Sequence, residues 1–360
     1  MQADCIVIGG GLIGLFTARE LARNGMKVTI IERGEVGREC SWAGGGILSP
    51  LYPWREPAAL AELIRFCQKE YPMLAQALYG ETGIDPEWWQ SGLLLLEAQD
   101  TEQASLWAAA SQSILEILSV EQLKIMEPSA NEHDGSALWI PEVGQIRNSR
   151  LIPALKKNLI NLGAELLEHT EVRRIRLHKN IVQAVETTHG EYTAAITIIA
   201  NGAWGTDLLP ALVIRPIRGQ MICYQATPGY LRHILLKNSI YIIPRRDGHI
   251  LVGSTVEDVG YDKGTTEAAR AFLTEAAEDI LPGIKLFPVA GHWSGLRPAT
   301  QTGLPYICRH PEIKGLFLNI GHHRNGILLA PGSARLLADI ILERETAVPS
   351  APFQFQPESI

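Results

Sequence analysis

The first 32 residues constrain the fold most strongly, because closely spaced glycines separate two short apolar runs. Residues 9–14 read Gly-Gly-Gly-Leu-Ile-Gly. The run at 5–8 before them, Cys-Ile-Val-Ile, is typical of a buried parallel strand. Helical apolar spacing over 15–24 then ends at Gly25, and residues 28–31 form the second apolar run. This pattern predicts a strand, a helix and a strand around a glycine-rich turn that cradles a dinucleotide.

Each glycine of the turn has a separate role in such a cradle. Gly9 allows the tight turn, Gly11 lets the backbone approach a pyrophosphate, and Gly14 lets the helix pack closely on the strand. The pyrophosphate would lie at the helix N-terminus, where unpaired N–H groups favour an anion. Glu32 ends the second strand, where it can accept hydrogen bonds from both ribose hydroxyls and would repel a 2′-phosphate. FAD or NAD is therefore expected rather than NADP, and a glycine turn without a ligand is the alternative.

Composition and charge are typical of a large globular enzyme and exclude several other classes. With 360 residues, 46% of them hydrophobic, the chain can bury a sizeable core, and we expect two domains. A net charge of -7 argues against nucleic-acid binding. No apolar run is long enough to span a membrane, and the start of the chain lacks the features of a secretory signal, so a cytoplasmic location is expected. The five cysteines are scattered without a Cys-x-x-Cys pair, which favours reduced thiols, and we expect no metal site.

Apolar periodicity predicts helices and strands through most of the chain. Besides 15–24, helices are expected at 58–77 with a break at Pro72, 101–118, 151–162, 266–280 and 332–342. Further strands are expected at 93–96, 171–175, 181–186, 196–200, 219–224, 239–243, 249–253 and 316–320. The short strands between 214 and 292 predict a separate antiparallel sheet. The strand, glycine-rich turn and helix after 316 repeat the opening pattern, so the chain is expected to return to the cofactor domain.

Two further glycine-rich segments are candidate cofactor contacts. Residues 40–47 read Cys-Ser-Trp-Ala-Gly-Gly-Gly-Ile, where successive glycines would let the backbone approach a flat group. A flexible loop without a ligand is the alternative for this segment. The strand at 196–200 runs into Asn201, Gly202 and Trp204, which form a turn outside a strand's carboxyl end. Doubly wound sheets bind their ligands at such turns, so a second cofactor contact is expected there.

Together these motifs resemble the D-amino acid oxidase family of FAD-dependent oxidoreductases, and in particular its glycine-oxidising members. The resemblance covers nearly the whole chain, and its most specific part is the string Arg-Asn-Gly-Ile-Leu-Leu-Ala-Pro at 324–331. The other matching segments are the cradle with Glu32, 43–46, 216–220, 241–244, 295–298 and 321–323. The resemblance implies an α/β fold in which a Rossmann-like FAD-binding domain interleaves with an antiparallel-sheet substrate domain. The implied boundaries are 1–85, 141–213 and 294–360 for the FAD-binding domain, and 86–140 and 214–293 for the substrate domain.

The resemblance also implies which residues hold the substrate. Arg297 matches the family's carboxylate-binding arginine, Tyr241 matches the tyrosine that shares this carboxylate, and Arg324 matches a further arginine near the flavin. Chemistry favours such a site, because oxidation of an amino acid by a flavin mainly requires orientation of its Cα–H bond. A planar guanidinium fixes a carboxylate through two parallel hydrogen bonds. A solvated surface arginine and a tyrosine packed in the core are the alternatives.

The FAD is expected to bind non-covalently. Some relatives attach the flavin through a cysteine aligned near residues 296–297, and this chain has none at that point of the sequence. The expected FAD contacts are Gly9, Gly11, Leu12, Ile13, Gly14, Glu32, Arg33, Ser41, Ala43, Gly44, Gly45, Gly46, Ile47, Val172, Ala200, Asn201, Gly202, Trp204, Arg297, His323, Arg324, Asn325, Gly326 and Ile327.

Several pocket positions depart from the relatives' pattern. His323 stands where a phenylalanine usually precedes the motif arginine, and Ser239 replaces a histidine two residues before the site tyrosine. Ile47 and Val256 stand where some relatives place methionines. Because these residues shape the pocket wall, the preference among small amines does not follow from the resemblance.

The leading hypothesis is FAD-dependent oxidative deamination of glycine, and also of sarcosine and small D-amino acids, with oxygen as the electron acceptor. The products would be glyoxylate or the 2-oxo acid, ammonia and hydrogen peroxide. The resemblance also implies a role in thiamine biosynthesis, where a thiazole synthase would receive the imine, and a homo-oligomer is a further candidate assembly. A dehydrogenase with another electron acceptor is one alternative, and a non-catalytic flavin-binding redox protein is another.

Overall fold

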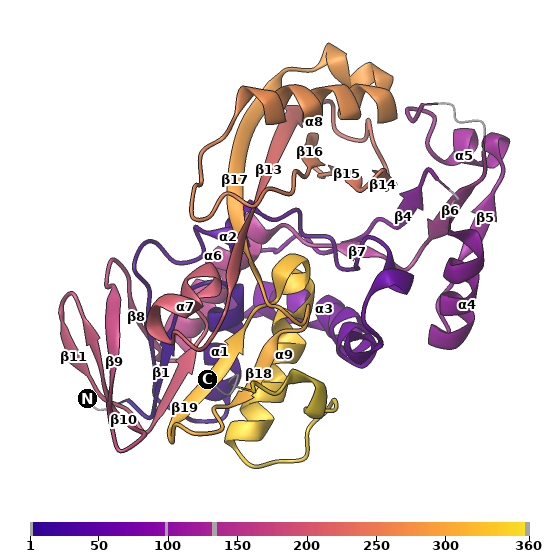
Figure 1. Cartoon of the computed structure of the whole chain (residues 1–360). Coiled ribbons are helices and arrows are strands. Elements are labelled where there is room, and N and C mark those ends of the chain that lie inside the picture. The colour runs from indigo at the N-terminus through magenta and orange to yellow at the C-terminus, as the bar shows by residue number, and fades with distance from the viewer. Residues whose placement is uncertain (1–2, 98–99, 132–134, 357–360) are drawn as a thin grey trace.

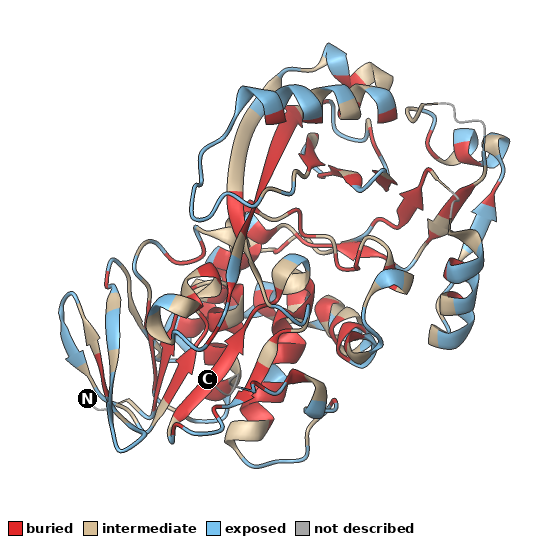
Figure 2. Ribbon diagram, viewed as in Figure 1, coloured by how far each residue is buried: buried red, intermediate tan, exposed pale blue. Residues whose placement is uncertain are grey.

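The computed structural model describes residues 3–97, 100–131 and 135–356. Within these residues, two large sheets organise the molecule, one in the lower half of Figure 1 and the other in the upper half. Figure 2 shows that most strands of both sheets are buried. By contrast, β9 (Val172–His178), β11 (Gly190–Tyr192) and α4 (Thr101–Ser111) at the periphery carry much of the exposed surface. No helix in the described part of the chain has both the length and the apolar character needed to cross a membrane.

The first sheet is mostly parallel and has helices on one face. Its strand order is β18 (Tyr306–Arg309), β19 (Leu316–Ile320), β12 (Ile196–Ile199), β1 (Cys5–Ile8), β2 (Val28–Ile31) and β8 (Glu165–Leu167). Only β18 pairs in the antiparallel direction. Every residue of β1 and β2 is buried, which is typical of a parallel sheet covered on both faces.

The two faces of the first sheet are covered by different elements. Cys5 and Val7 of β1 belong to a core shared with four helices, whereas Ile6 and Ile8 belong to a second core on the opposite face. The helices are α1 (Leu12–Arg23), α3 (Ala61–Thr82), α6 (Asn148–Asn161) and α9 (Gly326–Ile341). The second face is covered by a three-stranded sheet of β9 (Val172–His178), β10 (Ile181–Thr187) and β11 (Gly190–Tyr192).

The second large sheet is mainly antiparallel. Its order is β17 (Val289–Ala299), β13 (Arg215–Gln225), β16 (His249–Gly253), β15 (Ile240–Pro244), β14 (Ile234–Lys237), β4 (Leu93–Leu95), β6 (Ala137–Ile140) and β5 (Glu116–Leu118). The helix α8 (Glu267–Ile280) packs Leu273, Ala277 and Ile280 on one face of this sheet. The long pair β13 and β17 extends from this sheet toward the first one (Figure 1) and so connects the two halves.

Shorter elements complete the described fold. The remaining helices are α2 (Cys40–Ala43), α4 (Thr101–Ser111), α5 (Val120–Met126) and α7 (Gly205–Leu208), and the short β3 (Trp89–Gln90) pairs with β7 (Gly144–Gln145). The 3-10 turns are η1 (Pro53–Arg55), η2 (Ala58–Leu60), η3 (Gly202–Trp204), η4 (Pro282–Leu286), η5 (His323–Asn325) and η6 (Ala351–Phe353).

Three helix predictions were wrong in their extent. The helix expected at 101–118 ends at Ser111, because Gln112 adopts a left-handed conformation, and the following residues pair as β5 with β6. The helix expected at 58–77 starts later, at Ala61, and continues through Pro72 to Thr82 instead of breaking there. A tertiary contact beside that proline, from the buried Tyr71, holds α3 against α9.

The last helix begins six residues before its predicted start at 332. It starts at Gly326 and includes Pro331, which lacks the N–H that would bond to the carbonyl of Ile327. The hydroxyl of Tyr71 donates a hydrogen bond to that same carbonyl. The unpaired acceptor is therefore satisfied by a side chain from α3, which lets the helix begin next to the cavity described below.

Candidate active site

A cavity of about 710 Å³ lies between the two large sheets. Its wall combines the carboxyl ends of β1, β2 and β12, the segment around α2, the facing strands β13, β15 and β17, and the turn η5. All predicted FAD and substrate residues except Gly14 line this one cavity. Residues more than 300 positions apart in the sequence thus line the same cavity. The sequence pattern alone indicated only separate cofactor contacts.

The glycine-rich turn has the geometry that its spacing predicts. Gly9 has a φ of +111°, and a Cβ there would lie 2.5 Å from the carbonyl oxygen of Ala200. A Cβ at Gly14 would lie 1.9 Å from the carbonyl oxygen of Gly9, so this residue permits close packing of α1 and does not line the cavity. The hydroxyl of Ser41 accepts a hydrogen bond from Leu12 N at 2.8 Å and so contacts the first turn of α1.

Glu32 is held at the end of β2 by backbone N–H groups. Its Oε2 accepts a hydrogen bond from Gly10 N at 2.8 Å, and its Oε1 accepts one from Gly34 N at 2.9 Å. Beside it, the Arg33 guanidinium lies 3.6 Å from the centre of the Trp204 ring and forms an ion pair with Glu39 at 2.9 Å. The cavity therefore offers a fixed carboxylate, an aromatic ring and a helix N-terminus along one path, which fits the ribose and pyrophosphate of an ADP-containing cofactor.

The glycines of 43–47 form an ordered wall of the cavity. A Cβ at Gly46 would lie 2.0 Å from the carbonyl oxygen of Ile146. The buried Arg245 donates hydrogen bonds to the carbonyl of Gly45 at 2.8 Å and to Gln145 Oε1 at 2.7 Å. Burial lowers the pKa of Arg245 to about 10. These contacts hold the backbone at the cavity surface, where a flat ring system could lie against it.

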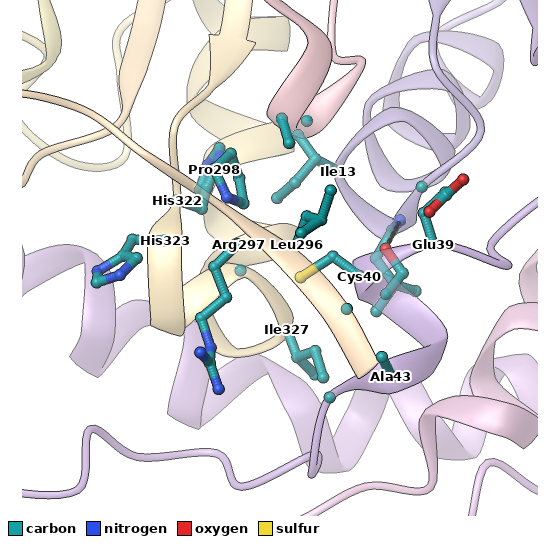
Figure 3. A pocket seen from close by; sticks show the side chains of 18 of the residues that line it. Ile13, Glu39, Cys40, Ala43, Leu296, Arg297, Pro298, His322, His323 and Ile327 are labelled. Carbon is teal, nitrogen blue, oxygen red and sulfur yellow. Dashed lines mark hydrogen bonds between the residues drawn. The ribbon is translucent and has the colours of Figure 1, made fainter. Parts of the chain in front are cut away.

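The three predicted substrate residues reach the cavity from different elements. Arg297 comes from β17, Tyr241 from β15 and Arg324 from η5. Figure 3 shows the Arg297 side chain extending from β17, with His323, Ile327 and Cys40 around it. Burial lowers the pKa of Arg324, and the positive charge of Arg297 lowers it further. The site thus concentrates positive charge, which favours an anionic ligand such as a carboxylate.

Two neighbouring histidines at the cavity are electrically neutral near pH 7. His322 is buried, with its Nε2 2.9 Å from Ser333 Oγ, and burial lowers its pKa to about 3. Burial also lowers the pKa of His323 to about 4, with smaller effects from the charges of Arg324 and Arg297. His323 lines the cavity at the position where relatives were expected to carry a phenylalanine. It therefore adds a neutral polar ring to the wall.

Several residues that line the cavity were not predicted from the sequence. They are Glu39, Tyr52, Glu56, Met221 and Ser254, together with the glycine Gly219. Cys40 comes from α2 and lies beside β17, and burial raises the pKa of its thiol. Nothing in the local pattern marks the residues that were not predicted, because each reaches the cavity through the packing of distant segments. Only Gly219 lies inside one of the matching segments, 216–220.

The fold and the cavity define a class of dinucleotide-dependent oxidoreductases with two interleaved sheets. A model of the family described as FAD dependent oxidoreductase matches residues 4–340. The chain belongs to this family, and FAD is its cofactor. The predicted family, α/β fold class, cofactor and enzyme class are thereby confirmed.

The chain is similar over nearly its whole length to glycine oxidases. It is 42% identical over 358 residues to the glycine oxidase of Pseudomonas aeruginosa, with 98% of each chain covered. The crystal structure of glycine oxidase from Geobacillus kaustophilus matches with a TM-score of 0.94 at 32% identity, covering 100% of this chain and 99% of the other. A bifunctional ThiO/ThiG protein of Trichormus variabilis is 33% identical over 352 residues, which are 96% of this chain and 54% of that protein.

Proposed function

We propose that this protein oxidises glycine to iminoacetate and that oxygen takes up the electrons. The observation that carries the proposal is the convergence of Arg297 and Tyr241 on the cavity that also contains the dinucleotide cradle. The similarity to glycine oxidases supports the same substrate. Bound in this cavity, FAD would supply the redox chemistry, namely uptake of a hydride from the substrate carbon and transfer of two electrons to oxygen. Water then hydrolyses the imine to glyoxylate and ammonia, and oxygen with two electrons and two protons gives hydrogen peroxide.

The protein's own contribution is orientation. The Arg297 guanidinium binds the substrate carboxylate, and the Tyr241 hydroxyl shares it. Arg324 adds positive charge on the η5 side of the cavity. Sarcosine and small D-amino acids share the carboxylate and a neighbouring amine, so we include them as further substrates.

The predicted FAD contacts that line the cavity provide the binding surface for the cofactor. Glu32 receives the ribose hydroxyls, and the N-terminus of α1 receives the pyrophosphate. The segments 43–47 and 323–327 border the substrate end. We propose that the FAD is non-covalent, because the raised pKa of Cys40 keeps its thiol protonated and poorly nucleophilic. Acid precipitation should release all of the flavin, and flavin retained in the pellet would contradict this.

We make three wider proposals, which concern a partner protein, the cellular location and the domain boundaries. The fusions of ThiO with ThiG among the relatives support transfer of the imine to a thiazole synthase. The described cysteines are all unpaired, which supports a reducing cytoplasm. The boundaries 1–85, 141–213 and 294–360 against 86–140 and 214–293 remain our proposed division into FAD-binding and substrate domains.

Replacement of Arg297 tests the substrate assignment. Arg297→Ala should raise the KM for glycine by about 100-fold or more, since a charge-assisted bidentate contact is lost. Arg174→Ala, which removes an exposed ion pair with Glu186, is the control and should keep the wild-type KM. If Arg297→Ala retained the wild-type KM, this residue would have no part in binding the carboxylate.

A further inference from the structure

The Arg297 guanidinium donates three hydrogen bonds within the protein, and these hold it in place. Nη1 donates to the carbonyl oxygens of Thr255 at 3.2 Å and Arg218 at 3.4 Å. Nη2 donates to the hydroxyl of Ser254 at 2.5 Å. Two of these acceptors belong to the segment that follows β16, so the segment fixes the guanidinium.

These contacts leave one pair of donors for a ligand. A guanidinium has five N–H groups, and the two on Nη1 are both used. One N–H of Nη2 is used by Ser254. Among the described residues, Nε has no hydrogen-bond acceptor and Nη2 has only Ser254, so the edge formed by Nε and Nη2 keeps donors for a ligand. This edge can donate two parallel hydrogen bonds to a carboxylate.

Ser254 is itself placed by the sheet. It follows Gly253, which pairs with Met221 of β13 and with Tyr241 of β15. A Cβ at Gly253 would lie 2.9 Å from both Met221 Cγ and Tyr241 Oη, so the strand end requires a glycine there. The end of β16 therefore lies beside one proposed substrate residue, Tyr241, while Ser254 contacts the other, Arg297.

Thr255, the residue after Ser254, is also held in place by hydrogen bonds. Gln220 N donates to Thr255 Oγ1 at 2.8 Å, and that hydroxyl donates to Glu257 Oε1 at 2.5 Å. The other oxygen of Glu257 accepts from Arg218 Nη2 at 2.6 Å. The backbone around Ser254 and Thr255 is thus tied to β13, and its acceptors cannot easily follow a displaced guanidinium.

We infer that Ser254 is a positioning residue for substrate binding, whose hydroxyl orients Arg297 so that its Nε and Nη2 edge faces the substrate carboxylate. This inference rests on the proposed function for the identity of the substrate, but its geometry concerns any small carboxylate. It predicts a loss of carboxylate affinity when the hydroxyl is removed, with little effect on the oxidation step once the substrate is bound.

The test compares Ser254→Ala and Ser254→Thr holoenzymes with the wild type. The Kd of glycolate, which has a hydroxyl in place of the amine of glycine, is measured by the change in flavin absorbance, and kcat and KM are measured for glycine. Ser254→Ala should raise the Kd of glycolate and the KM of glycine by about tenfold, as expected for one hydrogen bond to a charged group. The kcat should change by less than about threefold, and Ser254→Thr should restore most of the affinity.

Ser105→Ala is the matched control, because it removes a hydroxyl that is hydrogen-bonded at 2.7 Å to a backbone carbonyl in α4, outside the cavity. Wild-type glycolate affinity in Ser254→Ala would overturn the inference, as would equal losses in the alanine and threonine variants. If the wild type bound glycolate but did not oxidise glycine, the proposed function would fail while the inference could still be judged from the Kd values. No binding of glycolate by the wild type would overturn both.

Discussion

The guanidinium of Arg297 lies against the bare backbone of Gly219. A Cβ at residue 219 would lie 2.1 Å from Nη2 and 2.3 Å from Nη1 of Arg297. The two residues belong to β13 and β17, whose pairing opposes Gly219 to Gly295 and Ile217 to Arg297. Since the strands are fixed by this ladder, the arginine occupies space that only a glycine can leave open.

Gly219→Ala should therefore displace the guanidinium and raise the KM for glycine by about tenfold to 100-fold. The control is Gly80→Ala in α3, where a Cβ meets open space and should leave the KM unchanged. Steady-state kinetics measure the KM for glycine of both variants and of the wild type. A wild-type KM in Gly219→Ala would show that the position of the guanidinium does not matter for substrate binding.

Glu32→Gln should weaken the binding of FAD by about tenfold, because the carboxylate accepts two backbone hydrogen bonds and is expected to receive the ribose hydroxyls. Fluorescence titration of the apoprotein with FAD measures the Kd. Glu35→Gln, which alters an exposed ion pair with Arg38, should keep the wild-type Kd. Equal affinities in all three proteins would remove Glu32 from the binding surface.

Tyr261→Ala should speed the release of FAD by about tenfold. The Tyr261 ring stacks on Trp204 with centroids 6.1 Å apart, and its hydroxyl donates to the carbonyl of Ala203 at 3.3 Å. Both contacted residues line the cavity, so the tyrosine supports that wall from outside. Tyr79→Ala, which removes an exposed ring on α3, serves as the comparison. The rate of flavin release into apoflavodoxin or another flavin trap should separate the two variants, and identical rates would refute this role.

His323→Phe should reduce the sensitivity of the protein to acid. The folded pKa of His323, about 4, lies below the ordinary 6.5, so the unfolded chain binds the proton more readily between these values. The free energy of unfolding therefore falls as the pH is lowered from about 6.5 toward 4, at up to about 1.4 kcal/mol per pH unit for this group. His322 adds a similar dependence that the variant retains.

Urea unfolding of the holoprotein between pH 6.5 and 4.5 measures this dependence. His323→Phe should lose less stability across the range than the wild type. His178→Phe changes an exposed histidine on β9 and should retain the wild-type slope. Parallel stability curves for the wild type and His323→Phe would contradict the lowered pKa.

The part of the site that could be predicted is local in sequence. Gly9, Gly14 and Glu32 lie within one strand, helix and strand, so their spacing alone specifies the turn. By contrast, Ser254 contacts Arg297 across 43 residues through the pairing of β13 with both β16 and β17. No periodic pattern encodes that contact. The steric role of Gly219, which leaves room for the Arg297 guanidinium, likewise becomes visible only once the strands are paired.

The limits of two predicted helices were wrong for different reasons. The sequence pattern predicts that the last helix starts at Gly332. The hydroxyl of Tyr71 supplies a partner for the carbonyl of Ile327, which Pro331 cannot pair with, and so allows the earlier start at Gly326. Gln112 ends α4 in a left-handed conformation that the residue type does not favour. At the start of the last helix, the structure depends on a neighbour, Tyr71, that the linear pattern cannot identify.

The visible spectrum of the purified protein tests the proposed oxidation of glycine. It is recorded without oxygen before and after addition of glycine, and again after air is admitted. Glycine should bleach the flavin band, and air should restore it with formation of hydrogen peroxide. A flavin band that glycine leaves unchanged at saturating concentration would contradict the proposed oxidation of glycine.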